Sequence, residues 1–141
     1  MKMIQLNMKR YFAVLMLVLA LFSSCKEDED TEIDQANLTG NTWEYDHADA
    51  GDDFSNAFID AFLEGSSYTF NSDKTYSSVQ LGFENEGVWS FSDDKITLDA
   101  GGDFEQVWEV MELSSNTLQY ETTTIDDESG DKSTVTYTFK R

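Results

Sequence analysis

Ser133-Thr134-Val135-Thr136-Tyr137-Thr138-Phe139-Lys140 is the stretch that decides the fold. Its apolar residues alternate with threonines. Side chains of a β-strand point to opposite faces in turn, so strict alternation indicates a strand with one buried face. The chain contains no proline, which is compatible with continuous strands. A strand is therefore predicted over 133–140.

Seven earlier segments show the same short apolar runs, separated by turn residues. We predict strands at 42–47, 67–70, 75–81, 88–91, 96–98, 104–113 and 117–124. Turns are predicted at 71–74, 84–87, 92–95, 101–103 and 114–116, with a flexible acidic loop at 126–131. Short strands joined in sequence by tight turns indicate an all-β fold. We expect eight strands in an antiparallel up-and-down meander, closed or nearly closed into a barrel, because closure removes exposed edges.

Residues 52–64 depart from this pattern. Here apolar residues recur at helical spacing, namely Phe54, Ala57, Phe58, Ala61 and Phe62. An aspartate at 52 or 53 can cap such a helix and Gly65 can end it. We predict one short helix between the first two strands. Its Phe face would either cover one barrel end or act as a mobile lid over a ligand mouth.

The N-terminal part, residues 8–30, reads MKRYFAVLMLVLALFSSCKEDED. Lys9 and Arg10 precede an apolar run over 11–22, and Met8 just before them is an alternative start to Met1. The run is shorter than the about 20 apolar residues that cross a bilayer and has the length of a signal-peptide core. Ser23-Ser24-Cys25 follows it. Residues 22–25 resemble the lipobox of bacterial lipoproteins, with Phe22 where that pattern prefers Leu.

This resemblance implies a signal peptide over 1–24 and lipid attachment at Cys25, whose acyl chains would anchor the protein stably in a membrane. Residues 25–37 then form an acidic flexible tether, and the folded domain spans 38–141. Lys26 followed by acids resembles the export signal of surface-displayed lipoproteins in some Gram-negative bacteria. We expect a surface-exposed outer-membrane lipoprotein. The alternatives are a periplasm-facing lipoprotein and an ordinary secretory signal with an incidental cysteine.

The charge balance narrows the possible partners. The chain has 28 acidic and nine basic residues, a net charge of −19. The leader holds three of the basic residues and no acid, so the remainder carries −22. Nucleic acids are bound through Lys and Arg that neutralise phosphates, so we expect no nucleic-acid partner. The acidity suits a soluble domain on a crowded surface.

Three phrases resemble the lipocalin-like domain of small bacterial lipoproteins. They are Leu38-Thr39-Gly40-Asn41-Thr42-Trp43, the hairpin over 68–76, and Gly87-Val88-Trp89-Ser90-Phe91 with Ile96-Thr97-Leu98. Two features differ from that pattern: one extra residue separates Gly40 from Trp43, and Lys74 replaces the usual turn glycine. The extra residue would turn Trp43 to the other face unless a bulge or a later strand start restores it. The resemblance implies that Trp43 packs at the closed end of a barrel.

Two functions follow from this reading. In the first, the barrel binds a small apolar or amphiphilic ligand, and inward aromatics form its wall. The candidate wall residues are Phe58, Phe62, Tyr68, Phe70, Trp89, Phe91, Trp108, Tyr120 and Tyr137, with Leu118 and Phe139. The same residues are the expected core of so small a barrel. In the second, the barrel is solid and the protein is a non-enzymatic accessory protein that contacts a cell-surface partner through loops or an outer face.

Catalytic and metal-binding patterns are weak in this sequence. His47 is the single histidine, and no phosphate-binding loop is present. The acidic runs at 49–53 and 126–131 lack the spacing of a calcium loop. We therefore expect no enzymatic activity, no cofactor and no metal site.

Overall fold

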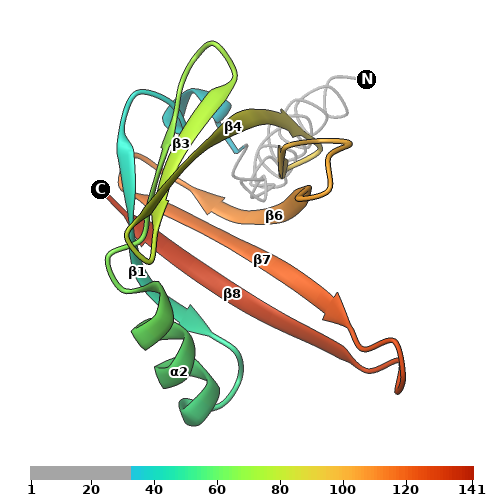
Figure 1. Ribbon diagram of the computed structural model, residues 1–141. Helices are drawn as coiled ribbons and strands as arrows, with labels where there is room; N and C mark the ends of the chain where they lie inside the picture. Colours follow the sequence, from blue (N-terminus) through green and yellow to red (C-terminus); the bar gives the residue numbers. More distant parts are fainter. Residues whose placement is uncertain (1–32) are drawn as a thin grey trace, which may run out of the picture. The chain divides into compact units, whose positions relative to one another are not determined.

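The computed structural model describes residues 33–141. The expected leader, Cys25 and most of the tether lie outside the described residues. The elements, shown in Figure 1, are η1 (Gln35–Asn37), β1 (Thr42–Asp49), α2 (Asp53–Leu63), β2 (Ser67–Phe70), β3 (Thr75–Gln80), β4 (Phe83–Ser92), β5 (Lys95–Leu98), β6 (Gln106–Leu113), β7 (Thr117–Ile125) and β8 (Lys132–Lys140).

The eight strands form a closed barrel in chain order. Each strand pairs antiparallel with the next, and β8 returns to pair with β1. This confirms the all-β, up-and-down, closed architecture with one helix between the first two strands. Because strand directions alternate, the connections after β1, β3, β5 and β7 lie at one end, here called the α2 end. The chain enters β1 at the opposite end, here called the Trp43 end.

The observed strand bounds lie within two residues of the predicted ones, except at the start of β4. Residues 84–87 were predicted as a turn, but they belong to β4. The chain instead reverses at Leu81 and Gly82, whose φ angles are 51° and 78°. Two consecutive residues at positive φ give a tight two-residue hairpin whose twist matches the strands. Gly82 adopts its positive φ without steric strain, and the polar residues 84–87 continue β4.

Trp43 seals its end of the barrel. Its side chain is fully buried, and its Nε1 donates a hydrogen bond of 2.9 Å to the carbonyl of Leu38. The guanidinium of Arg141 lies 4.6 Å from the centre of the Trp43 ring system. The structural role expected for Trp43 is confirmed. β1 begins at Thr42, after Gly40 at φ 84°, so the extra residue precedes the strand and leaves its register intact.

Two smaller features concern Lys74 and the residues just before β1. Lys74 takes a φ of 70°, the conformation that the usual glycine would supply, and its Nζ lies 4.0 Å from the centre of the Trp89 ring system. Before β1, Ile33 packs against the core and Asp34 caps η1. Residues 33–37, which the expected tether includes, thus contain a side chain that packs on the core and the short helix η1.

A large aromatic cluster fills the barrel. The buried core consists of Leu38, Trp43, Tyr68, Phe70, Tyr76, Trp89, Ile96, Leu98, Trp108, Val110, Leu113, Leu118, Tyr120 and Phe139. Trp108 and Tyr120 stack in parallel with centroids 4.0 Å apart, and Tyr68 meets Trp108 edge-on at 4.8 Å. Such pairs add stability beyond the area they bury.

Candidate functional site

α2 is attached to the barrel through its polar side. Asp60 Oδ1 accepts a hydrogen bond of 2.7 Å from the Tyr45 hydroxyl and one of 3.0 Å from the Ala48 amide. Asn56 Oδ1 accepts another from the Ala50 amide at 2.6 Å. β2 pairs with β1 as far as Glu44, and the Tyr45 amide donates to the Ser66 carbonyl, so the part of β1 after Tyr45 has a free edge. The helix covers that edge by supplying acceptors for its amides.

The Phe face of α2, defined as Phe54, Ala57, Phe58, Ala61 and Phe62, therefore points to solvent. The three phenylalanines are 82%, 65% and 52% exposed, and the helix contains no fully buried residue. The expectation that this face covers a barrel end was wrong. Helical spacing identifies an apolar face, but the unpaired amides of β1 decided which face docks.

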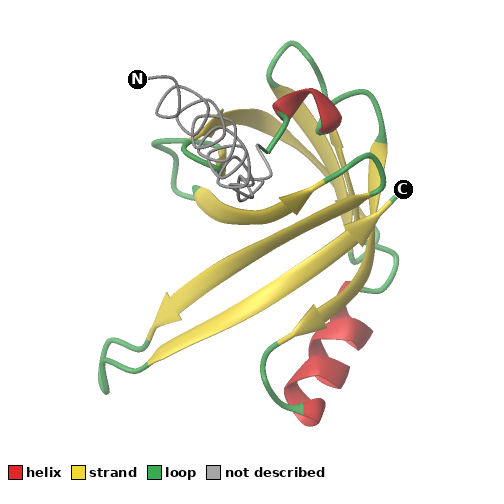
Figure 2. Ribbon diagram, turned by 180° about the vertical axis from the view of Figure 1, so that it is seen from behind, coloured by secondary structure: helices red, strands yellow, loops and turns green. Residues whose placement is uncertain are grey.

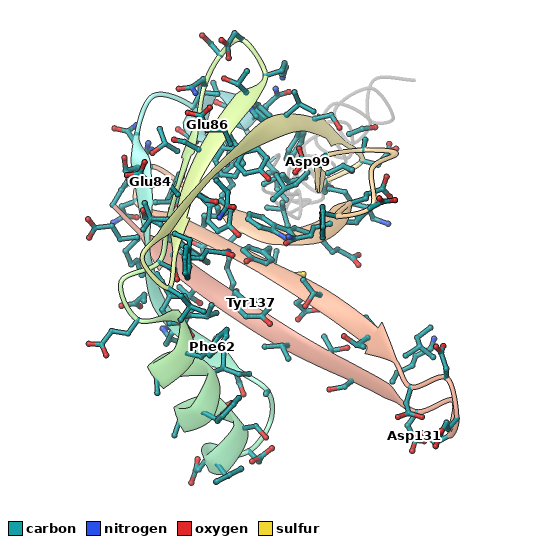
Figure 3. All side chains as sticks on the ribbon, viewed as in Figure 1. Phe62, Glu84, Glu86, Asp99, Asp131 and Tyr137 are labelled. Atoms are coloured by element: carbon teal, nitrogen blue, oxygen red, sulfur yellow. The ribbon has the colours of Figure 1, made fainter. Side chains whose placement is uncertain are left out.

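The candidate wall residues separate into three groups. Tyr68, Trp108 and Tyr120 lie within the packed core. Phe70 and Trp89 are buried and Phe91 is half-buried, and all three lie near the β2–β3 or β4–β5 turns, toward the Trp43 end. Tyr137, Phe58 and Phe62 lie at the α2 end, as Figure 3 shows for Tyr137 and Phe62. The strands do not bring all nine residues around one site.

Two aromatic side chains, Tyr45 and Tyr137, form what is here called the rim at the α2 end. Tyr45 and Tyr137 are both half-buried there. Tyr137 stacks on Tyr120 with centroids 5.2 Å apart, and Tyr45 meets Phe139 edge-on at 5.5 Å. The stack that runs through Trp108 and Tyr120 thus ends at the partly exposed ring of Tyr137.

A hollow of about 280 Å³ lies between part of α2 and β1. It is lined by Tyr45, Asp46, Asp60, Ala61, Glu64 and Gly65. A second hollow of about 290 Å³ lies on the outer face over β2, β3 and β4 and includes Glu84 and Glu86, which Figure 3 labels. Neither hollow includes any of the nine candidate wall residues, so reasoning from the sequence missed both. The acids at 46 and 64 carried no periodic or motif signal.

Hydrogen bonds from β1 stabilise the charged form of Asp60. Donation from the Tyr45 hydroxyl, followed by the Ala48 amide, lowers the pKa of the Asp60 carboxyl. Burial, followed by the hydrogen bond to Asp60, raises the pKa of the Tyr45 hydroxyl. Tyr45 thus stays a neutral donor and Asp60 a charged acceptor across the physiological range. Burial also raises the pKa of Tyr68 to about 12.

Acid is therefore expected to weaken the attachment of α2 to β1. The pKa of Asp60 is lower in the folded state than in the unfolded state, so its contribution to stability is present at neutral pH and is lost as pH falls below about 4. Asp60→Asn keeps an oxygen acceptor without the charge, so it should remove this loss of stability in acid. The measurement is the amide chemical shift of Ala48 against pH, with Asp53→Asn as the control. An unchanged titration in Asp60→Asn would contradict the assignment.

The acidic loops are used for local structure. Asp49 accepts from the Gly51 amide, and Asp126 accepts from the amides of Glu128 and Ser129. Within residues 33–141, no group of three or more His, Cys, Asp or Glu side chains is arranged to hold a metal ion. His47, largely exposed, bonds to neighbouring Asp46 at 2.9 Å.

Comparison with known families agrees with this geometry. The family model described as a lipocalin-like domain matches residues 26–120. The chain belongs to the lipocalin-like family. The match covers β1 through β6 and the first part of β7, and in this lipocalin-like domain β8 completes the ring. No curated protein matches the chain. None of the helices in the described part has the length and apolar character needed to cross a membrane.

Proposed function

We propose that this protein is a lipid-anchored binding protein whose lipocalin-like domain takes a small apolar or amphiphilic ligand at the α2 end. The observation that carries the proposal is the aromatic stack that ends at half-buried Tyr137, beside half-buried Tyr45. Membership of the lipocalin-like family supports a capacity to bind ligands. Packed rings occupy the centre of the barrel, so the rim offers a ligand more room than the core does.

The test compares two half-buried aromatics at opposite ends of the barrel. All core residues lie between 38 and 139, so a shortened chain of residues 26–141 keeps the whole closed sheet and needs no detergent. N-phenyl-1-naphthylamine serves as the fluorescent apolar probe. Tyr137→Ala should weaken its binding about tenfold through loss of an aromatic contact. Phe91→Ala, at the Trp43 end, should leave binding unchanged. Equal effects of the two variants would refute a site at the α2 end.

The anchor is a separate part of the proposal. The sequence of residues 22–25 and the acidic segment after Cys25 support a lipoprotein displayed on the outer membrane. In the full-length chain, Cys25→Ser should abolish incorporation of labelled palmitate and release the protein from the membrane fraction, because acyl chains supply the attachment. Protease treatment of intact cells should degrade the unaltered protein if it faces outward. Palmitate incorporation by Cys25→Ser would exclude this anchor.

An accessory role is the second candidate. The exposed Phe face of α2 favours it, because contiguous exposed apolar residues commonly mark interaction sites. Crosslinking on intact cells, with a photoreactive residue at position 58, would distinguish the two. Capture of one cell-surface protein favours the accessory role, whereas labelling of small molecules alone favours ligand binding.

A further inference from the structure

We propose that the Phe face of α2, together with the acidic hollow beside it, binds a cationic amphiphile that has one hydrocarbon chain and a positively charged head group. This inference rests on the proposed function, names the ligand class, and extends the site from Tyr45, which belongs to the rim and also lines the hollow, onto the surface of α2. It assigns the hydrocarbon chain to the Phe face and the head group to the hollow between α2 and β1.

The apolar half of the site is already formed. The rings of Phe58 and Phe62 lie nearly parallel, at 13°, with centroids 6.5 Å apart. Ala57 and Ala61 lie between the phenylalanines along the helix, and both are exposed, so the Phe face is continuous and apolar. More than half of each ring is exposed to water, so covering these rings with a hydrocarbon chain is favourable.

The acidic half adjoins it through Ala61, which belongs both to the Phe face and to the wall of the hollow. The hollow presents the carboxylates of Asp46, Asp60 and Glu64, and among the described residues no lysine or arginine lines it. α2 itself contains no basic residue. A positive head group is therefore attracted to the position where an anionic one is repelled.

The size of the face favours a small amphiphile over a second copy of the chain. Taking about 200 Å² for an aromatic side chain, the three exposed rings offer roughly 400 Å². Stable protein interfaces bury about 800 Å² on each partner. The net negative charge of the chain also opposes self-association through an acid-flanked face. A single-chain amphiphile needs only the area that is present.

The experiment uses the shortened chain of residues 26–141 and three probes with the same decyl chain, each below its micelle concentration. Decyltrimethylammonium, decyl glucoside and decyl sulfate differ only in the head group. Calorimetry should give the tightest binding for the cationic probe. Phe58→Gln combined with Phe62→Gln should weaken it about tenfold. Glu64→Gln should weaken the cationic probe about threefold and leave the glucoside unchanged.

Matched controls lie elsewhere on the surface. Phe104→Gln removes a ring that is 83% exposed, and Glu112→Gln removes an exposed acid of β6. Neither should alter binding. If the glucoside binds as tightly as the cationic probe and Glu64→Gln changes nothing, this inference fails but the proposed function stands. If no decyl probe binds at all, this inference fails, and the naphthylamine test of Tyr137→Ala against Phe91→Ala decides the proposed function separately. Loss of concentration-dependent dimers in the double Phe variant, without any probe binding, would assign the face to a second copy instead.

Discussion

Gly87→Ala is expected to destabilise the barrel by about 2–4 kcal/mol. A Cβ at position 87 would lie 2.2 Å from Asp99 Oδ1 and 2.7 Å from the Tyr76 ring. That carboxylate accepts from the Tyr76 hydroxyl at 2.7 Å and from the Val88 amide at 3.0 Å. The added methyl group must displace Asp99, so both hydrogen bonds are lost or distorted. Urea unfolding of the shortened chain, followed by tryptophan fluorescence, measures the loss.

A double-mutant cycle separates this cause from a general intolerance of strand residues. Asp99→Ala removes the carboxylate that the new methyl group would meet. Gly87→Ala should then cost less in the Asp99→Ala background than alone, because the two residues are in direct contact. Additive free energies would show that Asp99 is not the group that requires glycine at this position.

Trp43→Ala is expected to cost about 3–5 kcal/mol, the range for removing a fully buried large aromatic side chain. Trp43→Phe should cost less, about 1–3 kcal/mol. It keeps a ring in the core but leaves the carbonyl of Leu38 without its 2.9 Å donor. Thermal unfolding by circular dichroism gives both values.

Arg141→Ala provides the comparison for Trp43. Arg141 is exposed and contributes a cation–π contact, which is worth about 0.5–1 kcal/mol at such a site. Equal losses of stability in Arg141→Ala and Trp43→Ala would contradict this assignment. They would show that the exposed Arg141 contributes as much to this end of the barrel as the buried Trp43 ring and its hydrogen bond.

Most of the fold could be predicted because alternation is a local property. β2 was predicted at its observed bounds, and β8 began one residue before its predicted start. The turn at 84–87 was wrong because clustered polar residues resemble a turn, whereas Leu81 gave no sign that it would adopt a positive φ. That conformation depends on the pairing of β3 with β4, which composition does not encode.

The candidate site was less predictable for a physical reason. Aromatic residues such as Trp108 and Tyr120 were correctly placed on inward faces, but whether inward rings line a cavity or fill it depends on their packing with one another. The orientation of α2 depended on hydrogen bonds between Asp60 and the edge of β1, residues with no shared sequence pattern. Contacts between distant segments therefore set the site.

The pairing of β1 with β8 has a consequence for the order of folding. Seven of the strand pairings join neighbours in sequence, whereas the pairing of Glu44 with Lys140 joins positions at opposite ends of the domain. Such distant contacts form late because the two ends of a long chain segment must first meet. A chain that emerges with its N-terminus first cannot close the ring until its last strand has appeared.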